Sequence, residues 1–179
     1  MAELVSKRYA LSIFEAGLEL EKLDIFNKEL KYLDEVLKAE KDFFEILKNP
    51  RISKDEKKSL ITEIFRGRLS QEVINFFYII IDKRREKFIF DIIREYQSIY
   101  NEYNNILKVE AVTAIQMDEK AKEKLKLVLE NKLGKKVDII NKVDKSIIGG
   151  VLLKMEGKII DSTIRSQLKK LENLITNVH

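Results

Sequence analysis

The amino-acid sequence predicts a mainly α fold, with an N-terminal six-helix bundle followed by a small α+β domain of order β-α-β-β-α. Apolar residues recur at helical spacing through the first part of the chain, whereas after Leu107 they alternate as in a strand. The charge changes at the same place, from 19 basic against 20 acidic residues up to Asn105 to 15 against 10 from Ile106 onward. We therefore predict two domains, residues 1–105 and 106–179.

The second to fourth helices of the bundle are expected from stripes and end signals. The second helix carries apolar residues at helical spacing, namely Phe26, Leu30, Leu33 and Leu37. A short third helix stops before Pro50, the only proline in the chain. The fourth begins with a predicted capping box, in which Ser53 and Glu56 each bind the other's backbone amide. Gly67 suits the end of this helix.

The fifth and sixth helices are the most regular part of the bundle. Ser70 is a candidate cap for the fifth, which is apolar almost all round. The three isoleucines at 79–81 could belong to a strand, but the length of the periodic segment from Ser70 to Arg85 favours a helix. The sixth helix carries a long stripe, namely Ile89, Ile92, Ile93, Tyr96, Ile99, Tyr100 and Tyr103.

The second domain is predicted to alternate between strands and helices. Strands are expected near residues 109–115, 136–143 and 150–156. Asp118 is expected to cap the helix between the first two strands, and Gly134 to close it. A turn at Gly157 and Lys158 then leads to a last helix capped by Asp161.

The first helix, about residues 2–20, has two apolar stripes. One stripe contains Leu4, Leu11, Phe14 and Leu18, and the roughly opposite one contains Val5, Tyr9, Ile13, Ala16 and Leu20. Two interpretations stay open, because a helix at the centre of the bundle would be covered on both sides by its own chain. Alternatively, one stripe packs inward and the other forms a groove for a helix of another protein. The fifth helix could then provide the second wall.

The composition excludes several kinds of catalytic site. The chain has no cysteine, and its one histidine is His179, so thiol catalysis and histidine-based metal sites have no ligands to build on. The Gly149-Gly150 pair lacks the spacing of a phosphate-binding loop, and we interpret it as a close backbone approach or a turn entering a strand. The carboxylates are mixed with lysines on polar helical faces. We expect no cofactor, no metal and no catalytic residue.

Membrane insertion and nucleic-acid binding are not favoured. The N-terminus has no basic stretch followed by an apolar run, and the longest apolar run, residues 76–81, is far too short to cross a bilayer. We expect a soluble, cytoplasmic protein. The pI of about 9.0 allows a nucleic-acid partner, but an acidic protein partner is the favoured interpretation, because no basic cluster is interleaved with stacking aromatics. The basic triplet at residues 83–85 fits a helix end, with phosphate binding as the alternative. An enzyme with an unrecognised carboxylate site also remains an alternative.

Four stretches of this sequence together resemble one known family. They are residues 8–10 with 14–16, residues 47–53 with Lys57, residues 143–151, and residues 160–162 with Arg165, Leu168 and Leu171. In this order and at this chain length they resemble the delta subunit of the F-type ATP synthase, whose mitochondrial relative is the oligomycin-sensitivity-conferring protein. Two small departures are Ser12, where the family often has Ala, and Ser162-Thr163, where it often has Gly-Ser.

The resemblance implies partners and binding positions. It implies that the N-terminal domain binds N-terminal segments of alpha subunits in a groove between the first and fifth helices. The implied contact positions are Val5, Tyr9, Ser12, Ile13, Ile79, Asp82 and Lys83. The C-terminal domain would join the b subunits of the peripheral stalk. Its motif residues, Gly149, Gly150, Asp161 and Arg165, are expected to be structural.

The function implied by the resemblance is mechanical. A non-catalytic stator component would link the catalytic head to the peripheral stalk, so that rotor torque is resisted and proton flow is coupled to ATP synthesis. Such a subunit lies at the cytoplasmic face of the bacterial cell membrane and reaches the membrane only through the complex, with no nucleic acid involved.

Overall fold

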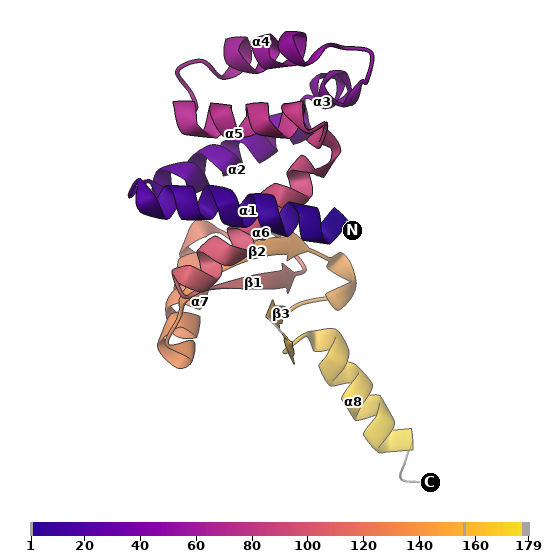
Figure 1. The fold of residues 1–179 in the computed structure, drawn as a ribbon. Coiled ribbons are helices and arrows are strands. Elements are labelled where there is room, and N and C mark those ends of the chain that lie inside the picture. Colours follow the sequence, from indigo (N-terminus) through magenta and orange to yellow (C-terminus); the bar gives the residue numbers. More distant parts are fainter. Residues whose placement is uncertain (1, 156, 177–179) are drawn as a thin grey trace. The chain divides into compact units, whose positions relative to one another are not determined.

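The computed structural model describes residues 2–155 and 157–176, so that His179 lies outside the described residues. The chain divides into two compact units, Met1–Tyr100 and Asn101–His179 (Figure 1). The boundary expected after residue 105 lies just beyond the end of the last helix of the first unit. The expected fold class, a mainly α protein with a small α+β part, is confirmed. None of the described helices combines the length and apolarity needed to span a membrane.

The first unit is helical throughout its described residues. Its elements are α1 (Ala2–Glu19), α2 (Leu23–Ala39), α3 (Lys41–Lys48), α4 (Lys54–Phe65), α5 (Gln71–Asp82), the short 3-10 helix η1 (Glu86–Phe88) and α6 (Ile89–Tyr103). Helix α5 lies between α4 and α1 (Figure 1). Its buried residues are Val73, Ile74, Phe76, Phe77, Ile80 and Ile81. The isoleucine run is therefore helical, as its period predicts.

Two serines at helix starts differ in what they bind. The predicted capping box of α4 is confirmed, with Ser53 Oγ accepting from the Glu56 amide at 3.2 Å and Glu56 Oε2 accepting from the Ser53 amide at 2.9 Å. Ser70 occupies the cap position of α5, but its hydroxyl donates to Glu29 Oε2 of α2 at 2.6 Å. Glu29 also accepts from the Ser70 amide at 2.9 Å. The start of α5 is thus fixed to α2 and is not capped by its own side chain.

Helix α1 packs inward through a face that lies between its two apolar stripes. The buried residues of this face are Ser6, Ala10, Ile13, Phe14 and Gly17. The small side chains allow a close approach of α2, since a Cβ on Gly17 would lie 3.0 Å from the side chains of both Leu23 and Phe26. Most of both stripes is left partly or fully exposed. The interpretation of α1 as a central helix covered on both sides is therefore wrong.

The second unit is built on a mixed four-stranded sheet. Its elements are β1 (Ile106–Thr113), α7 (Glu119–Leu133), β2 (Lys136–Val143), the 3-10 helix η2 (Lys145–Ile147), β3 (Val151–Met155), β4 (Lys158–Asp161) and α8 (Ile164–Thr176). The strand order is β2-β1-β3-β4, with β1 and β2 parallel and the other pairs antiparallel. Helix α7 connects the parallel pair, because parallel neighbouring strands need a crossover connection. Leu129 of α7 packs on Val109, Ala111, Val137, Ile139 and Leu153 of the sheet.

The end of the chain differs in two details from the prediction. Strand β4 follows the turn at Gly157 and adds an edge to the sheet where only a turn was expected. The cap of α8 is Thr163, whose Oγ1 accepts from the Ser166 amide at 3.2 Å, and not Asp161. Asp161 ends β4 and accepts from the Thr163 amide at 2.9 Å. The sequence alone does not tell which of Asp161 and Thr163 caps the helix, because both Asp and Thr are favoured at the N-cap position.

Candidate functional site

An open hollow of about 350 Å³ lies on the outer side of α1, in the N-terminal unit. Its lining residues are Leu4, Val5, Arg8, Tyr9, Ser12 and Arg85. Five of them come from α1, where the spacing of four residues places Leu4, Arg8 and Ser12 along one ridge. Val5 and Tyr9 form the next ridge, closer to the bundle, and both are half-buried.

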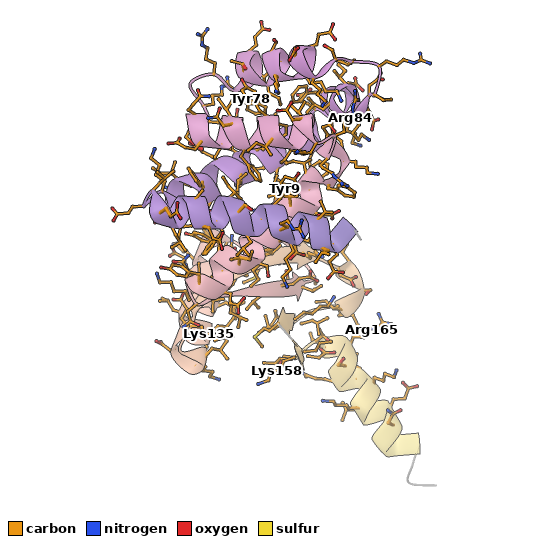
Figure 2. The ribbon with its side chains drawn as sticks, in the orientation of Figure 1. Tyr9, Tyr78, Arg84, Lys135, Lys158 and Arg165 are labelled. Atoms are coloured by element: carbon orange, nitrogen blue, oxygen red, sulfur yellow. The ribbon has the colours of Figure 1, made fainter. Side chains whose placement is uncertain are left out.

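Tyr9 connects this hollow to α5. Its ring meets the ring of Phe76 edge to face, with centroids 6.3 Å apart. In Figure 2, Tyr9 lies between α1 and α5. The hydroxyl of Ser12 donates to the Arg8 carbonyl at 3.0 Å, within the same helix. The Ser12 hydroxyl is therefore already bonded within its own helix, and the two charged residues that line the hollow are Arg8 and Arg85.

Arg85 is placed by the way α5 ends. Arg84 has φ of 53° and its amide donates to the Ile81 carbonyl at 2.9 Å, while the Arg85 amide donates to the Ile80 carbonyl at 2.9 Å. This pair of bonds is a Schellman motif, in which the left-handed residue is usually glycine. Figure 2 shows Arg84 at this end of α5. The basic triplet at residues 83–85 therefore follows the last helical turn and reverses the chain direction.

The residues after Arg85 hold this turn firmly. Glu86 is buried, and its carboxylate accepts from Lys57 Nζ of α4 at 2.7 Å. The side chains of Lys57 and Glu86 are 2% and 7% exposed, so water does not screen this ion pair. The guanidinium of Arg85 lies over the ring of Phe88, 5.8 Å from its centroid. Backbone, ion pair and ring together position Arg85 at the rim of the hollow.

The three positions on α5 and its cap lie in different surroundings. Ile79 is 50% exposed, an unusual state for isoleucine on a helix that is otherwise largely buried. Asp82 faces α4 and pairs with Lys58 at 2.7 Å, while its carbonyl accepts from Lys54 Nζ at 2.8 Å. Lys83 is the exposed cap residue of α5. None of these three residues lines the hollow itself.

Ile13 was expected among the partner contacts, but its side chain is buried within the first unit. It is 3% exposed and belongs to the core of the first unit. The helical period places Ile13 on the side of α1 opposite Leu4. The inward face of α1, however, is centred on small residues, which the search for large apolar side chains did not consider. Leu4, Arg8 and Arg85 line the hollow and were missed as site residues. The spacing Leu4-Arg8-Ser12 was the available signal for the first two, whereas Arg85 comes from a distant turn.

The motif residues of the second unit form a connected turn around the start of α8. Gly150 has φ of 80°, and a Cβ there would lie 2.3 Å from the Ser162 carbonyl oxygen. Arg165, labelled on α8 in Figure 2, donates to Ser146 Oγ of η2 at 3.2 Å. The hydrogen bond from the Ser166 hydroxyl, 2.5 Å long, and that from the Thr163 amide lower the pKa of the Asp161 carboxyl below its ordinary value. These contacts are all within the unit.

Helix α8 carries an uncovered apolar stripe. Ile164, Leu168 and Leu171 follow each other at helical spacing and are 43%, 52% and 56% exposed. Ile159 and Ile160 of β4 are also exposed. A further hollow of about 470 Å³ opens beside the end of β1, where Ile115 and Ile148 are among its lining residues. The second unit thus offers apolar surface of its own.

Among the described residues there is no group of three or more acidic, histidine or cysteine side chains that could hold a metal ion. The described lining of the hollow on α1 consists of two apolar side chains, a phenol, a hydroxyl and two guanidiniums. This lining suits binding of a side chain or a helix better than catalysis.

Comparison with known proteins assigns the family. Residues 5–175 match the family described as ATP synthase delta (OSCP) subunit. The chain belongs to this family. It is 42% identical to the ATP synthase subunit delta of Alkaliphilus oremlandii over 178 residues, which cover 99% of each chain, and 37% identical to that of Clostridioides difficile over 179 residues, again 99% of each chain. The protein is therefore a structural, peripheral component of an F-type ATP synthase stator.

A solved structure of low sequence identity shares the fold of this delta-family chain. A chain in the cryo-EM structure of the Toxoplasma gondii mitochondrial ATP synthase hexamer has a TM-score of 0.73, with 15% identity, over 96% of this chain and 97% of that one. At this identity the likeness concerns the fold alone. The order of a helical unit followed by a small mixed unit is thus shared with that chain over most of its length.

Proposed function

We propose that this delta-family subunit is a non-catalytic connector that binds N-terminal segments of alpha subunits with its first unit and b subunits with its second. In that role it would hold the catalytic head still against rotor torque, so that proton flow is coupled to ATP synthesis. The subunit would lie at the cytoplasmic face of the bacterial cell membrane. Binding alone performs this task, since no bond is made or broken by the subunit.

The observation that carries the head-binding role is the uncovered apolar surface of α1 and α5. Val5 and Tyr9 are half-buried at the floor of the hollow, and Ile79 is 50% exposed on the neighbouring helix. An amphipathic helix could bury these side chains with anchors at helical spacing. Burying one exposed isoleucine contributes about 1–2 kcal/mol, so a few such anchors give a slow off-rate.

For the stalk side, the supporting surface is the stripe of Ile164, Leu168 and Leu171 on α8. This stripe has the spacing of a helix-binding face. Two binding units in one chain raise the effective concentration at each contact, so modest affinities add to a durable link.

The experiment is a titration of the full chain with a peptide covering the alpha-subunit N-terminus, followed by circular dichroism and calorimetry. Wild type should bind and induce helix in the peptide, whereas Ile79→Asp should weaken binding by about tenfold or more. Ile25→Asp is the matched control, because Ile25 is 47% exposed on α2. Equal affinity of the Ile79 variant and wild type would contradict the proposed groove.

A further inference from the structure

The hollow on α1 has one charge sign only. Its two charged lining residues are Arg8 and Arg85, and its other lining residues are neutral. An anion bound between the two cations would offset their mutual repulsion. The apolar stripe of α1 explains why the floor of the hollow suits apolar side chains. It does not explain why two arginines lie at its rim.

Neither arginine has a carboxylate partner at ion-pair distance within the described part of the chain. The comparison with Arg94 is informative, because that exposed arginine pairs with Asp91 on its own helix at 3.2 Å. Lys58 and Lys57, from the neighbouring α4, also both have acidic partners. The guanidiniums at the hollow thus remain available to a ligand.

Arg85 is held in place before any ligand arrives. The Schellman bonds fix its backbone, the buried Glu86 fixes the next residue, and Phe88 lies under its guanidinium. A side chain that is already ordered loses less conformational entropy on binding. Its planar fork also matches the two oxygens of a carboxylate.

We propose that the helix docked on α1 presents an aspartate or glutamate beside its apolar stripe, and that Arg8 and Arg85 bind this carboxylate. This inference rests on the proposed binding of the alpha-subunit segment and adds the chemistry that recognises it. The apolar floor takes the anchors, while the cationic rim sets the register and direction of the helix. A nucleic acid fits this surface poorly, because its phosphate backbone is bound by a row of several cations, whereas the hollow has two.

The test uses the full chain and the alpha-subunit N-terminal peptide at low and high salt. The Arg8→Gln/Arg85→Gln double variant should bind about tenfold more weakly at low salt and should lose most of the salt dependence seen with wild type. Arg66→Gln is the matched control, since Arg66 is exposed at the end of α4 and lines no part of the hollow. It should keep the wild-type affinity and salt dependence.

A peptide series locates the carboxylate. Each aspartate or glutamate of the peptide is replaced by its amide; one replacement should weaken binding to wild type and have no further effect on the double arginine variant. Unchanged affinity and salt dependence in the double variant would overturn the carboxylate proposal, while a loss of binding in Ile79→Asp would still support the groove. Absence of binding to wild type would overturn both. Equal thermal unfolding of the variants serves as the folding check.

Discussion

Lys57 of α4 and Glu86 of η1 form an ion pair inside the first unit, with Nζ and Oε1 2.7 Å apart and both side chains less than a tenth exposed. The pair joins α4 to the turn that follows α5. Because Arg85 directly precedes Glu86, the same interaction fixes the rim of the hollow on α1. Lys57 follows one of the stretches that resemble the family. Its burial could not be predicted from the sequence, because a lysine in a helix is usually exposed.

Removing one member of the Lys57–Glu86 ion pair should lower the free energy of unfolding. Lys57→Met leaves Glu86 buried without a cation, and we expect a loss of about 3 kcal/mol in the free energy of unfolding. The companion Lys57→Met/Glu86→Leu variant should recover most of it, because a packed apolar pair replaces the charges. Lys58→Met is the control, since its pair with Asp82 is more exposed and should contribute less than about 1 kcal/mol. Urea unfolding measures all three; a loss below 1 kcal/mol for Lys57→Met would contradict a role for the pair.

Gly150 should tolerate no side chain. An alanine Cβ there would lie 2.3 Å from the Ser162 carbonyl oxygen, at a φ of 80°. We expect Gly150→Ala to destabilise the second unit by about 3 kcal/mol. Gly134→Ala is the matched control, because Gly134 has φ of 65° but open space around it, and strain alone should cost about 1 kcal/mol. Hydrogen exchange of the β1 and β3 amides reports the loss; equal effects of both variants would show that the contact with Ser162 is unimportant.

Acid should weaken the turn before α8. Hydrogen bonds from Ser166 and Thr163 lower the pKa of Asp161 in the folded chain, so its stabilisation is fully present above the ordinary pKa of about 4 and is lost as the pH falls through the lowered folded value. Asp161→Asn should therefore be less stable than wild type at pH 7, and the difference should shrink as the pH falls below the ordinary pKa of the carboxyl. Urea unfolding of the full chain, followed by amide resonances of α8 and β3, measures it. Ser166→Ala should show a similar pH dependence. A stability difference between Asp161→Asn and wild type that does not shrink as the pH falls would exclude the ionised carboxylate as its source.

The helices and some of their caps could be predicted because their signals are local. The Ser53 box and Gly134 each depend on residues within one or two turns, and the structure has both. Strand β4 was missed because it is only four residues long and fully exposed, so that no alternation marks it. Its pairing with β3 comes from tertiary contacts, which a single sequence does not reveal.

The binding face could be predicted only in part. Val5 and Tyr9 line the hollow, as the period of α1 indicates, and Ser12, which only the family resemblance had pointed to, lines it too. Ile13 is buried because the inward face of α1 is made by Ser6, Ala10 and Gly17, and small residues carry no weight in an apolar count. Arg85 reaches the hollow through the chain reversal after α5, a long-range consequence of packing.

The most direct test of the binding face is a titration of the isotope-labelled full chain with the alpha-subunit N-terminal peptide, followed by amide and side-chain resonances. Binding in the groove predicts the largest shifts at Val5, Tyr9, Ile79 and Arg85, with Leu168 of the second unit unchanged. Shifts confined to the second unit, or no shifts at all at saturating peptide, would contradict the assignment of α1 and α5 as the site that holds the catalytic head.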